Sequence, residues 1–183
     1  PDGDGGHLGG KRFALLFVAL PYHTTQGFLL AEWSEAENAI REFWSRLSRR
    51  VNLGKAKVQF VLDGEPKMKS LRTTLEGYGP NVSVTYSNKA EPNQNPIEAE
   101  VRAIRARAHA LQEASPVAEF RRPYYFGYAL KHAAFLRNYD WRESTHGIPH
   151  TMLTGETPDI RQFKGAQLFT PCVVHDQLNA PRG

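Results

Sequence analysis

Short apolar runs alternate with segments of helical periodicity along most of this chain. The apolar runs predict strands over residues 11–20, 25–33, 58–62 and 81–87. Apolar residues at helical spacing predict helices over residues 34–50, 70–78, 96–114 and 124–138. Ser34 followed by Glu37 is a capping-box pattern, which predicts that the first helix begins there. Two strands, a helix, a strand, a helix, a strand and two helices are typical of an α/β or mixed α+β domain.

The composition is that of a single globular domain. The chain has 183 residues, of which 40% are hydrophobic and 23% charged. We expect one domain over 1–175 and a linker-like end over 176–183. The longest apolar run, "FALLFVAL", is too short to cross a bilayer, and the glycine-rich start is unlike a signal peptide. The single cysteine, Cys172, excludes an internal disulfide and a multi-cysteine zinc site, which favours a reducing compartment.

The chain is mildly basic, and its cations are unevenly distributed. The formal net charge is +4 and the isoelectric point is about 9.3, which favours a polyanionic partner. Between Phe43 and Lys57 no acidic residue occurs, and the cations there are Arg46, Arg49, Arg50, Lys55 and Lys57. Cations also stabilise the C-terminal end of a helix. The cluster therefore fits a solvated helix end and a DNA-facing patch equally well.

The segment "KVQFVLDGEPK" places Asp63 at the end of a short strand that we expect to be buried. An aspartate followed by glycine is common turn chemistry, because the side chain caps the turn. In open α/β sheets, however, ligand-binding groups gather at the carboxyl ends of the strands. Asp63 is thus a candidate anchor for a metal ion if a second acid lies nearby.

The segment "NQNPIEAEVRAIRARAHAL" supplies the second acid, either Glu98 or Glu100. If Asn95 caps the helix and Pro96 is its first residue, Glu98 occupies the capping-box position. Glu98 would then have only a structural role. Glu100 is expected nearer the apolar stripe of the helix, on the same side as Arg107.

The helical wheel gives Glu98 a second interpretation. Glu98, Arg102, Arg105 and His109 fall in one row along an exposed edge of the helix. A metal-binding acid followed by arginines suits phosphodiester chemistry, because the arginines can hold nearby phosphates. The same row also fits an ordinary Glu–Arg pair on a solvated face.

Several segments together resemble a known family. These are "KRFALLFVAL", "SEAENAIREFW", "PNQNPIEAEVRAIRARAHAL", "YYFGYALKHAAFLRN" and "GIPHTMLTGETPDIRQFKGAQLFTPCVV". Their order and spacing are similar to the integrase catalytic core of copia-type (Pseudoviridae) LTR retrotransposons, within the retroviral integrase superfamily. The resemblance covers nearly the whole chain.

The resemblance implies a ribonuclease-H-like mixed sheet flanked by helices. It implies two aspartates and a glutamate that hold Mg²⁺ (or Mn²⁺) for DNA 3′-end processing and strand transfer. Asp63 matches the second aspartate and Glu98 best matches the glutamate, although spacing alone leaves Glu100 open. Expected DNA contacts come from Arg102, Arg105, Asn95, Gln94 and Lys67. The implied partners are element ends, target DNA and further copies of the chain, in the nucleus after a stage in cytoplasmic virus-like particles.

The chain departs from the family pattern at the first aspartate. No matching residue is evident, which places it on a strand upstream of Pro1. Asp2 and Asp4 are possible substitutes, but a glycine-rich loop is a poor platform for a metal. We therefore expect the sheet to lack its first strand and the chain alone to be inactive. The alternative is a catalytically dead relic of the fold that still binds nucleic acid.

Overall fold

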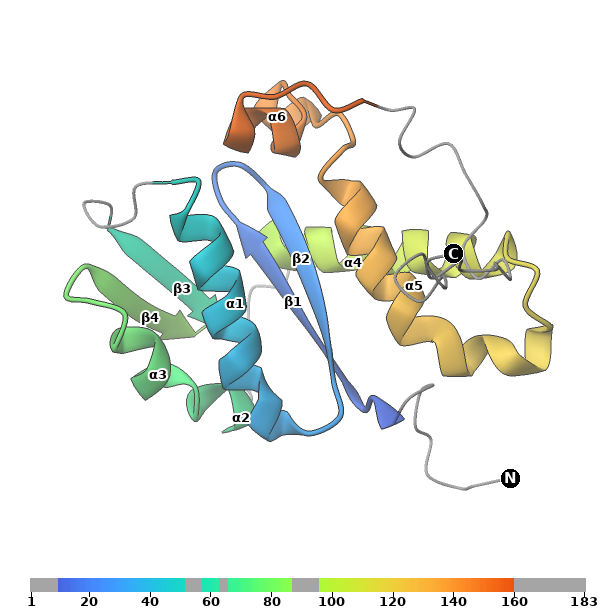
Figure 1. The fold of residues 1–183 in the computed structure, drawn as a ribbon, viewed down its shortest axis with the longest axis horizontal. Helices are drawn as coiled ribbons and strands as arrows, with labels where there is room; N and C mark the ends of the chain where they lie inside the picture. The colour runs from blue at the N-terminus through green and yellow to red at the C-terminus, as the bar shows by residue number, and fades with distance from the viewer. Residues whose placement is uncertain (1–9, 52–56, 63–65, 87–95, 160–183) are drawn as a thin grey trace, which may run out of the picture.

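The computed structural model describes residues 10–51, 57–62, 66–86 and 96–159. Its elements are β1 (Phe13–Ala19), β2 (Thr24–Leu30), α1 (Ala36–Ser48), β3 (Val58–Leu62), α2 (Pro66–Lys69), α3 (Arg72–Glu76), β4 (Val82–Tyr86), α4 (Pro96–Glu113), α5 (Arg122–Arg137) and α6 (Pro149–Thr154). The order of strands and helices confirms the expected mixed α/β class (Figure 1). None of the helices in the described ranges has the length and apolar character needed to span a membrane.

The described strands form two separate two-stranded sheets. β1 and β2 pair antiparallel, from Phe13 opposite Leu30 to Ala19 opposite Thr24. β3 and β4 pair parallel, in register from Val58 opposite Val82. Within the described residues no strand links β1 to β3.

The β1–β2 hairpin lies between two hydrophobic clusters. Leu15 belongs to the cluster that contains buried residues of α1, α3 and β4, whereas Leu16 packs against the cluster between α4 and α5. Successive strand residues point to opposite faces, so neighbouring leucines serve different cores. The hairpin is therefore covered on both faces. Figure 1 shows α1 on one side of the hairpin and α4 and α5 on the other.

The prediction that β3 is a buried strand is wrong. Val58, Phe60 and Leu62 are half-buried, while Gln59 is exposed and Val61 keeps 41% of its surface accessible. This alternation is typical of a strand with only one face packed on a core. Phe60 and Leu62 pack against the first cluster, so the apolar run reflects one packed face rather than two.

The first helix also begins differently from the prediction. α1 starts at Ala36, after a 3₁₀ turn over Trp33–Glu35, and the residue before it makes no side-chain capping bond. Ser34 Oγ donates to a carboxylate oxygen of Glu32, whereas a capping serine would accept a hydrogen bond from a backbone amide of the first turn. The capping-box prediction was wrong because the preceding tight turn carries the chain into the helix.

α5 packs closely against β2 because small and polar residues occupy the contact. A Cβ atom at Gly27 would lie 3.2 Å from the backbone of Lys131, so a larger residue would push the helix away. At the end of the helix, Asn138 Oδ1 accepts from the Thr25 amide at 2.7 Å and Nδ2 donates to the Thr25 carbonyl at 2.8 Å. The Asn138 amide thus pairs with the strand as a neighbouring backbone would.

Candidate nucleic-acid site

The two faces of α4 have the character that its sequence predicts. Ile104 and Ala108 are fully buried, whereas Arg102, Arg105 and His109 are exposed. The structure therefore confirms that the apolar stripe is buried and that these cationic side chains lie on the exposed side of the helix. Figure 1 shows α4 crossing behind the β1–β2 hairpin, which brings its first turns toward the region between the two sheets.

A groove of about 840 Å³ lies between the two sheets. Its walls come from β1, β3, α1 and the first turns of α4. Glu98, Arg102 and Arg105 line this groove together with Leu62, the last residue of β3. The structure thus brings the cationic row of α4 to the same cavity as the carboxyl end of β3.

Glu98 is partly buried at this groove, and its side chain has no hydrogen bond or ion pair with another described residue. It lies in the first turn of α4, where a negative charge is favoured by the helix dipole. A carboxylate held on a helix and directed to a groove can act as an oxygen ligand. Its chemistry fits the hard cations Mg²⁺ and Mn²⁺.

Several predicted site residues fall where the structure gives no description. They are Asp63, Gln94, Asn95 and the possible substitutes Asp2 and Asp4. Within the described ranges, no three His, Cys, Asp or Glu side chains form a group that could hold a metal ion. The candidate triad is therefore represented in the structure by Glu98 alone.

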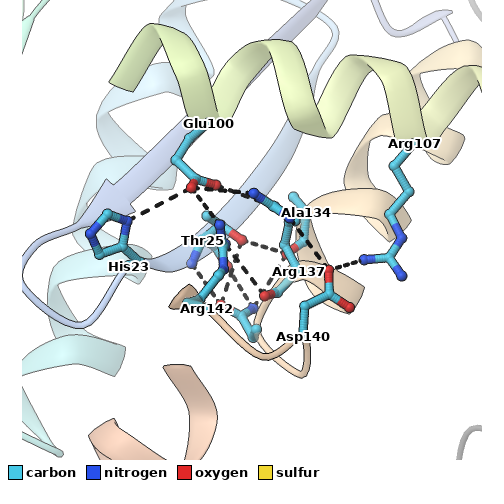
Figure 2. A network of polar contacts seen from close by, with 9 residues as sticks. His23, Thr25, Glu100, Arg107, Ala134, Arg137, Asp140 and Arg142 are labelled. Carbon is cyan, nitrogen blue, oxygen red and sulfur yellow. Dashed lines mark hydrogen bonds and ion pairs between the residues drawn. The ribbon is translucent and has the colours of Figure 1, made fainter. Parts of the chain in front are cut away.

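Glu100 lies two residues further along α4 and has a different environment. Its side chain is only 9% exposed and forms ion pairs with two arginines (Figure 2). Arg142 donates from Nη1 to Oε1, and Arg137 donates from Nε to Oε2 at 3.3 Å. His23 Nδ1 lies 3.7 Å from Oε1, the oxygen that Arg142 also contacts. Glu100 therefore joins α4 to the end of α5 and to the segment that follows it.

The arginines determine the charge state of Glu100. Burial on its own would raise the pKa of this carboxyl, because burial disfavours the charged form. Hydrogen bonds and charges from Arg142 and Arg137 outweigh burial and hold the pKa below its ordinary value of 4.5. Glu100 is therefore a carboxylate at neutral pH, with its oxygens already engaged by cations.

The network extends along α4 through a second acid. Arg107 donates to Asp140 Oδ2, and Arg137 Nη1 lies 3.6 Å from the same oxygen. Arg137 thus contacts both carboxylates, as Figure 2 shows. Burial, with a smaller contribution from the charge of Arg107, lowers the pKa of His132 below its usual value. Glu100, Arg137, Asp140 and Arg107 thus form a series of alternating charges that connects α4 with the end of α5.

Lys67, another expected DNA contact, is exposed on α2 and does not line the groove. Its Nζ lies 4.6 Å from the centroid of the Phe13 ring, in a cation–π contact. Its carbonyl accepts hydrogen bonds from Trp33 and Ser70. The structure therefore does not bring Lys67 together with Glu98 and the two arginines.

Sequence reasoning missed the partners of Glu100. Arg137 and Arg142 lie 37 and 42 residues away in sequence, so no local spacing links them to the acid. The available signal was the position of Glu100 near the apolar stripe, since a buried carboxylate needs a cationic partner.

Neither the known protein families nor the curated proteins that were compared with this chain give a match.

Proposed function

We propose that this chain is the catalytic core of a retroelement integrase that processes and transfers DNA 3′ ends. The observation that carries the proposal is the position of Glu98. This carboxylate lies with Arg102 and Arg105 at the groove where β3 ends, and no described residue neutralises it. The resemblance of the sequence to copia-type integrase cores supplies the reaction.

The groove also supports the finer interpretation of the fold, a ribonuclease-H-like sheet without its first strand. All residues of β3 and most of β1 line the groove, and each strand pairs with only one neighbour in the described residues. Unpaired strand edges are ready to accept another strand. We propose that sequence preceding Pro1 supplies this strand, which would join the two small sheets into one and carry the first aspartate.

The chosen residues fit the chemistry of phosphoryl transfer. Glu98 and Asp63 would hold Mg²⁺, which when bound activates the attacking hydroxyl and stabilises the leaving oxygen. Arg102 and Arg105, one and two turns further along α4, would hold the DNA backbone beside the cut. Glu98 would keep its carboxylate at a fixed position because α4 is anchored by Ile104 in the core.

The environment of Glu100 supports the choice of Glu98 as the metal-binding acid. Both oxygens of Glu100 already accept hydrogen bonds from arginines. Recruiting it to a metal would leave Arg142, whose side chain is 6% exposed, without its carboxylate. Glu98 requires no such rearrangement.

The test is a strand-transfer assay in Mg²⁺ and in Mn²⁺. The protein would be extended by about thirty residues upstream, about the length of a βαβ unit, which leaves ample room for one strand. The expected result is DNA joining by this protein and none by the Asp63→Asn or Glu98→Gln variant. Metal-dependent cutting without joining would instead indicate a nuclease of the same fold class.

Binding without any cutting would support the alternative function, a catalytically dead relic that binds nucleic acid. In that case Asp63→Asn would leave both the DNA affinity and its response to metal unchanged. If neither the extended protein nor its variants bound DNA, both proposals would be refuted.

A further inference from the structure

A second cavity, separate from the groove at Glu98, lies between α1 and the α5–α6 region. It has a volume of about 700 Å³. Its floor is the start of β2, over residues 24–27, and its walls come from the end of α1 and from α5 and α6. Among the described residues it shares only Phe43 and Leu47 with the groove, and no residue of α4 lines it. We call this cavity the α1–α5 cleft.

One wall of the α1–α5 cleft is cationic. Arg46, Arg49 and Arg50 line this wall from the C-terminal end of α1, and Lys131 adds a cation from α5, across the cleft. All four residues are exposed. No aspartate or glutamate is among the described residues that line the cleft. The arginine cluster noted in the sequence therefore faces a cavity instead of only a solvated helix end.

The arginine side chains are partly positioned by their own helix. Arg49 donates from Nε to the Ser45 carbonyl and from Nη2 to Ser45 Oγ, both at 3.2 Å. Arg46 pairs with Glu42 one turn earlier, in an exposed ion pair that contributes little to stability. Arg49 therefore keeps a fixed direction while no carboxylate of the described residues pairs with its charge.

The opposite wall is aromatic. Phe135 and Tyr139 lie one turn apart on α5 and just beyond it, with ring centroids 5.2 Å apart. The Tyr139 ring lies 5.0 Å from that of His150 on α6, which continues the series. All three line the cleft, and Phe135 keeps 43% of its surface accessible.

We propose that the α1–α5 cleft binds single-stranded nucleic acid. Its phosphates would lie along Arg46, Arg49 and Arg50, and its bases would stack against the Phe135 and Tyr139 side. A cationic groove beside aromatic rings is the usual arrangement for binding unpaired strands, because every base offers a face for stacking. Duplex DNA keeps its bases stacked within the helix, so it cannot use the aromatic wall. The proposal does not require catalysis at Glu98.

The test measures binding of a fluorescent single-stranded oligonucleotide to the whole chain by anisotropy, over a range of salt concentrations. The cleft variant is Arg46→Gln/Arg49→Gln/Arg50→Gln. The charge-matched control is Arg12→Gln/Arg72→Gln/Arg121→Gln, three exposed arginines that do not line the cleft. Phe135→Leu removes the exposed ring and keeps an apolar side chain.

The cleft variant should bind at least tenfold more weakly at 100 mM salt. The slope of log affinity against log salt should fall by about 2, because three arginines would no longer neutralise phosphates of the single strand. Phe135→Leu should weaken binding about tenfold without changing the salt slope, because stacking involves no counterion release. The control should change affinity by less than threefold.

Equal losses in the cleft variant and the control would overturn the proposal, since binding would then follow net charge alone. Absence of binding by the unmodified chain would also overturn it. If sedimentation showed a dimer that Phe135→Leu or the arginine substitutions dissociate, the cleft would be an interface between copies instead. Failure of the integrase proposal would be seen separately, as a lack of metal-dependent joining in the strand-transfer assay, which does not measure oligonucleotide affinity.

Discussion

The two glutamates in the first turns of α4 show how differently one helix can use the same side chain. Glu100 lies on the buried side, where Arg137 and Arg142 engage both its oxygens. Glu98 lies at the groove, where Arg102 and Arg105 accompany it and no described residue pairs with it. A carboxylate with its partners already in place stabilises a fold, whereas one without them is available to a ligand. This difference favours a structural role for Glu100 and is consistent with the metal-binding role proposed for Glu98.

The largest effect on stability should come from Glu100→Gln. Removing one member of a buried ion pair leaves the arginines without compensation and costs about 3–5 kcal/mol. Urea unfolding of this variant and of Glu98→Gln would measure the contrast. Glu98→Gln should change the free energy of unfolding by less than about 0.5 kcal/mol, as substitutions at unpartnered positions usually do. Equal destabilisation by both would remove the distinction between the two acids.

The next largest loss of stability is expected from a substitution in the contact between α5 and β2. Asn138→Ala would leave the Thr25 amide and carbonyl without partners, at a cost of about 1–3 kcal/mol. Thr154→Ala is a milder comparison, because its hydroxyl bonds only within and just beyond α6. Urea unfolding of both variants would measure the difference. If Asn138→Ala lost no more unfolding free energy than Thr154→Ala, the Asn138 amide would not hold α5 to β2.

At acid pH, the free energies of unfolding of the unmodified chain and of Glu100→Gln should become more similar. The pKa of Glu100 is lower in the folded chain than the ordinary value of 4.5. The ion pairs therefore stabilise the fold fully above about pH 4.5, and this contribution is lost as the pH falls through the lower folded value. Urea unfolding at pH 7 and at several values below 4.5 would show it. A constant difference across this range would argue against a charged Glu100.

The smallest stability effect is expected at the exposed arginines of α4. Arg102→Gln/Arg105→Gln should alter the free energy of unfolding by less than about 0.5 kcal/mol. It should nevertheless lower the salt dependence of duplex DNA binding, with the log–log slope reduced by about 2. The charge-matched control is Arg12→Gln/Arg121→Gln, two exposed arginines that do not line the groove. If the slope of log affinity against log salt concentration did not change, these arginines would not be DNA contacts.

Much of this architecture follows from local patterns. The apolar stripe at Ile104 and Ala108 and the exposed row at Arg102 and Arg105 are consequences of helical spacing, so the sequence predicts them. The predicted start of α4 at Pro96 matches as well, since proline is favoured in the first helical turn.

Other features could not be predicted, because they depend on contacts distant in sequence. The pairing of Glu100 with Arg142 needs the fold to bring two segments together. The one-sided burial of β3 depends on what covers each face, which an apolar run does not reveal. The aromatic wall beside Arg49 arises only when α1 and α5 are placed around the start of β2.

The most direct test of the central claim compares Glu98→Gln with Glu100→Gln in Mg²⁺-dependent DNA cutting and joining by the upstream-extended protein. Each variant would be assayed at a temperature where its unfolding curve shows it to be folded. We expect Glu98→Gln to lose activity by at least about a hundredfold, the scale expected for removal of a group that stabilises the transition state. Glu100→Gln should retain most of the activity while it unfolds more easily. Full activity in Glu98→Gln together with loss of activity in folded Glu100→Gln would contradict the choice of Glu98 as the metal-binding acid.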